Sequence, residues 1–213
     1  MAVAHCVAPA PKPYRFYPPF AHPRFRQRPR VHVEPKTYGR GIKMEKIDPI
    51  RIYVACLASY NNGILHGEWI DAEQGVDGIW RDVSQMLLKS PAEYAEEWVI
   101  HDYEGFCDIH LSEYASFETV AEYANFIETH GEVGSKLVAY FGNIEDAENA
   151  LQDHYAGEYD RLEDYAEELT EETTQVPENL RYYIDYEKMA RDLAINDVMT
   201  IEVGHSVHVF WRF

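Results

Sequence analysis

The chain is poor in cysteine and has no long apolar run. Its three cysteines (Cys6, Cys56 and Cys107) form no C-x-x-C pair, so the sequence predicts neither a disulfide scaffold nor a zinc site. No window approaches 18 consecutive apolar residues, and the N-terminus lacks the apolar region of a signal peptide. We therefore expect a cytoplasmic protein that does not span a membrane.

The sequence also lacks the common motifs of catalysis and cofactor binding. It has no Walker A loop, no G-x-G-x-x-G, no H-E-x-x-H and no calcium-binding loop of the DxDxDG type. Candidate catalytic groups are His101 and Asp102 with Glu104, and the pair His205 and His208. Side chains alternate between the two faces of an extended strand. His101 and Asp102, one position apart, and His205 and His208, three positions apart, would therefore point to opposite faces. The sequence therefore predicts a protein that is not an enzyme and holds no metal or cofactor.

Positive charge is scarce and unevenly placed. The chain of 213 residues has 37 acidic and 19 basic side chains, yet 46% hydrophobic residues provide ample material for a folded core. Residues 1–47 hold ten of the basic side chains, two acids and eight of the eleven prolines, which predicts a disordered basic tail. The remaining 166 residues hold nine basic and 35 acidic side chains, a net charge of −26. Such a field repels nucleic acid and attracts basic protein surfaces.

The basic tail has two interpretations. Met44 lies just before the first convincing strand, so translation could begin there and residues 1–43 would not exist in the native protein. The alternative is a genuine basic arm that folds back on the acidic body. The intact mass of the protein from its native host distinguishes the two.

Hydrophobic periodicity and turn residues predict an α+β fold with a strand-rich start, a helical middle, and a helix plus hairpin at the end. Asn62-Gly63 indicates a hairpin turn, and Asn143 is a predicted helix N-cap. The expected strands are 50–57, 64–70, 98–100, 198–203 and 207–211. The expected helices are 76–89, 116–131, 133–141, 144–155, 159–173 and 178–195, with a short helical turn at 90–93.

Seven acids at 160–172 recur at the spacing of one helix face, above an apolar stripe on the opposite face. On a continuous helix they span about 18 Å, or one carboxylate per roughly 3 Å of axis, against about 3.4 Å per phosphate along a DNA strand. Eight like-charge pairs at i+3 or i+4 cost roughly 2–4 kcal/mol at low salt. The seven acids are Asp160, Glu163, Asp164, Glu167, Glu168, Glu171 and Glu172.

Compensating cations are almost absent around this stripe. No Lys or Arg lies between Lys89 and Lys136, and none lies between Lys136 and Arg161. A highly soluble surface or adaptation to high salt is the ordinary explanation of acidic runs, but a surface without a target normally interleaves basic residues. Imitation of DNA phosphates is therefore the favoured interpretation. The candidate target-binding set adds Glu145, Asp146, Glu148, Asp153 and Glu158 to the seven acids above.

Several strings in this sequence, in this order, resemble the ArdA family of antirestriction proteins over residues 48–213. The strings are RIYVA at 51–55, YNNG at 60–63, LHG at 65–67, WID at 69–71, EEW at 96–98, IHDYEGF at 100–106, YAEE at 165–168, YYIDY at 182–186, MARD at 189–192 and HVFW at 208–211. Residues 1–47 have no counterpart in the family pattern.

The resemblance implies an elongated α+β protein of three small parts in series, at about 48–108, 109–150 and 151–213 by position. It also implies that the protein homodimerises into a curved rod like bent duplex DNA. Such proteins occupy the DNA-binding site of type I restriction–modification enzymes and so protect incoming plasmid or transposon DNA. The helix at 159–172 resembles the family's acidic motif. The aromatic pairs Tyr182-Tyr183 and Phe210-Trp211 are interpreted as core or dimer contacts. The alternative from another class is an acidic module that binds a different basic partner.

Overall fold

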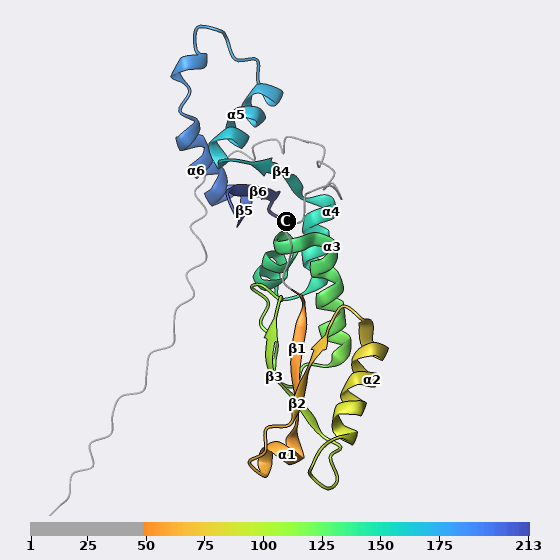
Figure 1. Ribbon diagram of the computed structural model, residues 1–213. Helices are drawn as coiled ribbons and strands as arrows, with labels where there is room; N and C mark the ends of the chain where they lie inside the picture. The colour runs from red at the N-terminus through yellow and green to blue at the C-terminus, as the bar shows by residue number, and fades with distance from the viewer. Residues whose placement is uncertain (1–48) are drawn as a thin grey trace, which may run out of the picture. The chain divides into compact units, whose positions relative to one another are not determined.

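The computed structural model describes residues 49–213, which form helices and two antiparallel sheets (Figure 1). This content confirms the predicted α+β class. The strands are β1 (Arg51–Cys56), β2 (Gly67–Asp71), β3 (Trp98–Glu104), β4 (Tyr155–Tyr159), β5 (Val198–Val203) and β6 (Ser206–Trp211). The helices are α1 (Leu57–Asn61), α2 (Gly75–Leu88), α3 (Phe117–Phe141), α4 (Ile144–Asp153), α5 (Leu162–Thr173) and α6 (Tyr186–Asn196), with a 3-10 turn η1 (Arg181–Tyr183).

The first sheet has the strand order β2-β1-β3, with both neighbours antiparallel to β1. Alternate residues of β1 therefore face opposite sides, and Ile52 and Val54 are fully buried. A register shift in the β1–β3 pair follows Tyr53. Helices α2 and α3 cover one face of this sheet (Figure 1).

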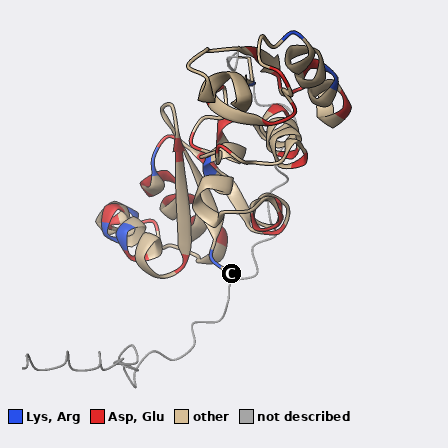
Figure 2. Ribbon diagram, turned by 90° about the horizontal axis from the view of Figure 1, so that it is seen from below, with Lys and Arg blue, Asp and Glu red and all other residues tan. Residues whose placement is uncertain are grey.

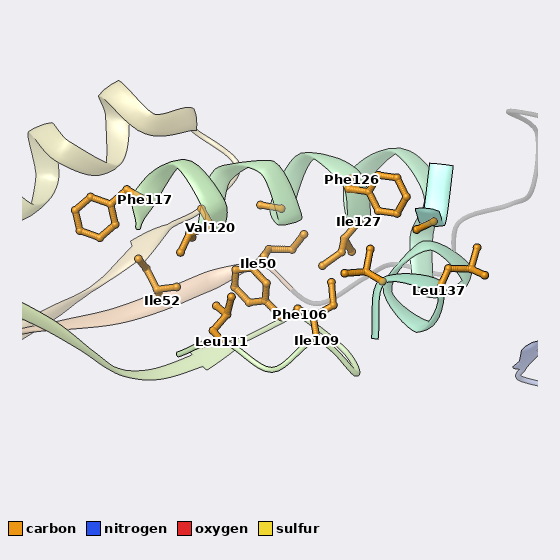
Figure 3. Close-up of a cluster of buried hydrophobic side chains, with 14 of the residues drawn as sticks. Ile50, Ile52, Phe106, Ile109, Leu111, Phe117, Val120, Phe126, Ile127 and Leu137 are labelled. Atoms are coloured by element: carbon orange, nitrogen blue, oxygen red, sulfur yellow. The ribbon is translucent and has the colours of Figure 1, made fainter. Parts of the chain in front are cut away.

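The larger hydrophobic core lies under α3 (Figure 3). Phe117, Val120 and Ile127 recur on one face of α3 and are fully or almost fully buried. Phe106 and Ile109, from the segment after β3, pack into the same cluster. Ser116 begins α3 as its N-cap, because its hydroxyl accepts the Thr119 N–H at 3.2 Å.

The second sheet has the strand order β4-β6-β5, and its final hairpin turns at Gly204 and His205 as predicted. Phe210 contributes to the larger core, whereas Val209, which points the other way, belongs to a smaller cluster with α5 and α6. Because α5 and α6 pack on this sheet, the sheet orients the outward face of α5.

The Asn62-Gly63 prediction was wrong in its turn type. The β1–β2 pair is antiparallel as expected, but α1 intervenes and β2 begins only at Gly67. Asn62 is the C-cap of α1, and Gly63 follows with φ +76°. A positive φ is typical both of hairpin turns and of helix ends, so the dipeptide alone does not distinguish them.

Other boundaries also differ from the prediction. The predicted helix 144–155 ends at Asp153, and its last predicted residue begins β4, a strand that the sequence analysis missed. Helix α5 begins at Leu162 and α6 at Tyr186, while residues 90–93 form bends and a turn without a helix. The predicted break at Gly131 is confirmed, because Gly131 has the non-helical angles φ +63° and ψ −153° and kinks α3 between the two predicted helices. The Asn143 N-cap is confirmed, since its side-chain oxygen accepts the Asp146 N–H at 2.8 Å.

The predicted part boundaries near residues 108 and 150 stay predictions. The predicted basic tail and the hypothesis of a start at Met44 fall outside the described residues.

Candidate acidic binding surface

Helix α5 is held at its start by one aspartate. The Asp164 carboxylate accepts the backbone N–H of Arg161 and, through its other oxygen, the Arg161 guanidinium, each at 3.1 Å. This contact is half of a capping box. The other half needs the N-cap side chain to accept the backbone N–H of Asp164, and an arginine side chain has no acceptor. The Asp164 hydrogen bond also raises the pKa of Arg161. Asp164 therefore has a structural role beside any role in binding.

The inward face of α5 is apolar, as predicted. Tyr165 and Ala166 are buried, and Leu162 and Leu169 pack against the same small cluster. Burial, and then the nearby Tyr159 and carboxylates, raises the pKa of Tyr165 far above its ordinary range. The helix can therefore turn only one face to solvent.

That outer face carries the carboxylate stripe. Asp160 precedes the first residue of α5 and lies in a bend, so it does not belong to the helical stripe, which corrects the sequence analysis. The remaining acids, spread over nine residue steps, span about 14 Å of helix axis, or one carboxylate per 2–3 Å. We define the α5 stripe as Glu163, Asp164, Glu167, Glu168, Glu171 and Glu172.

The α5 stripe is stabilised at its start and strained at its end. Glu163 and Asp164 lie in the first turn, where the helix dipole favours a negative charge. Glu171 and Glu172 lie near the C-terminal end, where the dipole opposes it. Arg181 offsets part of this cost by an ion pair with Glu171 at 3.4 Å. Six like-charge pairs remain at i+3 or i+4, so repulsion still costs about 1–3 kcal/mol at low salt.

The structure places the other five predicted acids on two neighbouring elements. Glu145 and Asp146 lie in the first turn of α4, where they also stabilise the helix. Glu148 and Asp153 are exposed on the same helix, and Glu158 is exposed on β4. The chain runs directly from α4 through β4 to α5, so these acids lie on elements that are consecutive with the α5 stripe.

Most cations of the described part lie in ion pairs with its own acids, so they do not form a competing basic surface. Lys136, for example, contacts both Asp108 at 3.1 Å and Glu132 at 3.3 Å, and both hydrogen bonds raise its pKa. Figure 2 shows acidic residues over much of the described chain and basic residues at few places. The other pairs are Arg51–Glu104, Arg81–Asp82, Lys89–Glu68, Arg161–Asp164, Arg181–Glu171 and Arg191–Glu187.

The two aromatic pairs singled out in the sequence have different surroundings. Phe210 is fully buried, which confirms a core role, and Trp211 packs partly buried against the smaller cluster. Tyr182 and Tyr183 are 90% and 83% exposed in the connection between α5 and α6, so they are not core residues. Leu180 beside them is half exposed. Their neighbour Arg181 pairs with Glu171, which brings this connection to the end of the α5 stripe.

The histidine pairs considered for catalysis do not form a site. His101 is exposed and packs its ring against Tyr60 at 4.6 Å between centroids. His205 is exposed in the final turn, whereas His208 is buried and its Nδ1 lies 3.1 Å from the Tyr155 hydroxyl. Burial lowers the pKa of His208, although Glu158 opposes this effect. Within residues 49–213 no group of three or more His, Cys, Asp or Glu side chains is arranged to hold a metal ion.

No helix of the described part has both the length and the apolar character that a bilayer span requires. Comparison with protein families matches residues 52–207 to the model described as antirestriction protein (ArdA). A comparison with curated proteins finds no match. Since the family match covers most of the chain, the protein belongs to the ArdA family of antirestriction proteins. This result confirms the resemblance drawn from the sequence strings.

Proposed function

We propose that the protein inhibits type I restriction–modification enzymes by occupying their DNA-binding site with carboxylates in place of phosphates. The observation that carries the proposal is the α5 stripe, which keeps one sign of charge on an exposed helix face despite its repulsive cost. DNA-binding proteins gain much of their affinity from Lys and Arg contacts that release counterions from phosphates. A carboxylate array of similar spacing competes for the same basic groove.

This mechanism is non-catalytic and needs no cofactor. Phosphate contacts position a DNA-binding protein without reading sequence, so a mimic without bases suits enzymes that differ in recognition sequence. It acts in the cytoplasm, where incoming plasmid or transposon DNA meets the restriction enzyme. Its strong negative charge excludes nucleic acid as its own ligand.

The first test titrates the protein against a type I enzyme and follows DNA cleavage and methylation at several salt concentrations. We expect near-stoichiometric inhibition that weakens with salt and is partly reversed by excess DNA. Inhibition that depends neither on the salt concentration nor on added DNA would contradict mimicry. If the folded protein does not inhibit at all, the alternative is a different basic partner.

A charge-reversal variant tests the α5 stripe itself. Asp164 caps the helix and Glu168 accepts a hydrogen bond from Tyr159, so the variant should avoid both. We therefore reverse Glu163, Glu167 and Glu172 to Lys and expect inhibition to weaken about tenfold or more, with a shallower salt dependence.

The matched control reverses three exposed acids on other elements and changes the net charge equally. Its residues are Glu113, Glu122 and Glu128. Equal loss in both variants would mean that total charge, rather than the α5 stripe, controls inhibition.

We also propose that a second copy of the chain covers Leu180, Tyr182 and Tyr183. Exposed tyrosines of this kind are enriched in protein interfaces, and a twofold dimer would use the same patch from both copies. Two α5 stripes would then lie on one assembly. Replacing both tyrosines with Ser should convert a dimer to a monomer in light scattering, whereas an unchanged molar mass would place the interface elsewhere.

A further inference from the structure

The end of the first sheet beyond β1 exposes several large apolar side chains. Helix α1, the end of α2 and the segment before β3 lie together there (Figure 1). Leu88 and Tyr94 are 86% and 87% exposed, Leu65 is 69% exposed, and Ile64 is 44% exposed. We call Ile64, Leu65, Leu88 and Tyr94 the distal patch. Single exposed apolar residues are ordinary, but a group on one end of a sheet is typical of an interaction site.

The segments that carry the distal patch are held together by hydrogen bonds, although they are distant in sequence. The Ser59 and Ser90 hydroxyls lie 2.8 Å apart, and the Leu57 N–H donates to the Glu97 carbonyl at 3.0 Å. His66 Nε2 lies 2.8 Å from the Met86 carbonyl oxygen. The patch is therefore preorganised, which lowers the entropic cost of binding.

Tyr94 adds a second sign of a functional surface. Its φ is +60°, in the left-handed region that favours glycine, while its ring is almost fully exposed. This conformation is unfavourable for a residue with a Cβ, and the exposed ring gains little packing to offset it. Such strain concentrates at functional sites.

The charges around the distal patch select its partner. Glu93, Glu96 and Glu97 are exposed beside it, and the nearby Lys89 already pairs with Glu68 at 3.7 Å. Two copies meeting through this patch would bring the three carboxylates of each copy together, which disfavours self-association. A basic partner surface with an apolar centre is complementary instead.

We infer that the distal patch is an apolar docking surface for the basic DNA-binding surface of the inhibited restriction enzyme. This inference rests on the proposed function and adds a second contact to it. Carboxylate contacts weaken as salt screens them, whereas burial of apolar side chains does not depend on counterion release. The distal patch therefore supplies the part of the affinity that persists at high salt.

The test compares Leu65→Ser/Tyr94→Ser with a control, Tyr114→Ser/Tyr140→Ser, whose tyrosines are 71% and 61% exposed elsewhere. Equilibrium binding of the full chain to a purified type I enzyme is measured across salt, with circular dichroism to verify folding. We expect the first variant to bind about tenfold more weakly at every salt concentration, with an unchanged slope of log Kd against log salt. The control should bind like the wild type. Should the double variant fold poorly, Leu88→Ser, at the exposed end of α2, replaces it.

Each outcome separates this inference from the proposed function. Equal binding of the variant and the wild type, or equal loss in the control, would overturn the distal patch and leave mimicry by the α5 stripe intact. A change of molar mass in the variant would assign the patch to self-association and overturn the inference. Failure of the wild type to bind the enzyme would overturn the proposed function itself.

Discussion

At the scale of single residues, His208 shows how burial sets a pH response. The side chain is 2% exposed, and desolvation lowers its pKa in the folded protein. The unfolded chain takes up this proton near pH 6.5, while the folded chain still holds the ring neutral. Protonation therefore favours unfolding, and the contribution of His208 to stability falls as the pH drops through about 6.5.

We predict that His208→Gln makes the free energy of unfolding less sensitive to pH between 7 and 5. Urea unfolding at the two pH values measures this sensitivity. His154 is the matched control, since burial also lowers its pKa but leaves it more exposed. His154→Gln should change the pH sensitivity less, and an equal change would indicate that burial of His208 is not the cause.

Gly131 adopts a backbone conformation that residues with a side chain avoid. Its φ of +63° with ψ of −153° interrupts α3, although a Cβ there would meet no atom within 4 Å. Backbone strain alone should therefore make Gly131→Ala destabilising, by about 1–3 kcal/mol. Gly142→Asn is the control, because Gly142 caps α3 in the left-handed helical region, which asparagine tolerates. Equal losses in chemical denaturation would contradict this assignment of strain.

At the scale of elements, α5 has a conflict between stability and binding. Glu167 has Glu163, Asp164 and Glu171 as like-charged neighbours at i−4, i−3 and i+4. We predict that Glu167→Lys raises the free energy of unfolding by about 1–3 kcal/mol at low salt, because three repulsions become attractions. The same change should weaken inhibition. Thermal or urea unfolding measures the first effect, and DNA cleavage measures the second.

Glu122→Lys on α3 is the control for that prediction, since Glu122 has only Glu118 as an acidic neighbour at this spacing. It should stabilise less and leave inhibition unchanged. A stripe kept for solubility alone would show no loss of inhibition after Glu167→Lys.

The elements that the sequence predicts best are those whose pattern has a single interpretation. The acidic and apolar stripes of α5 have one helical period, and Ser116 and Asn143 begin helices through local hydrogen bonds. By contrast, β4 is short, carries Gly157 and lies between helices, so its burial between two layers depends on tertiary contacts. The helical spacing of apolar residues therefore continued the predicted helix 144–155 into the first residue of β4.

The candidate surface was predictable in part for the same reason. Spacing places the α5 acids on one face, but it cannot show that Asp160 precedes the helix or that Arg181 returns to Glu171. The exposure of Tyr182 and Tyr183 also depends on how the connection between α5 and α6 leaves the sheet. The only hint of this exposure in the sequence is that both tyrosines follow Pro177 in the connection between two predicted helices. The distal patch could not be predicted from any one stretch of sequence, because its residues come from separate segments.

At the scale of the whole molecule, one excess of negative charge should give two salt effects of opposite sign. Residues 48–213 carry a net charge of −26, so the folded state repels itself and salt should stabilise it by screening. Binding to a basic groove uses the same charges attractively, so salt should weaken it. We predict that the unfolding temperature rises with salt over the range in which inhibition declines.

Differential scanning calorimetry and cleavage assays in the same buffers measure the two trends together. The Glu163→Lys, Glu167→Lys and Glu172→Lys variant should flatten both, because it removes repulsion within α5 and contacts with the target at once. The control at Glu113, Glu122 and Glu128 should flatten mainly the stability trend, because net charge governs self-repulsion while position governs binding. A control that also flattened the inhibition trend would mean that the target responds to the overall field of the protein and not to the spacing of carboxylates on one helix.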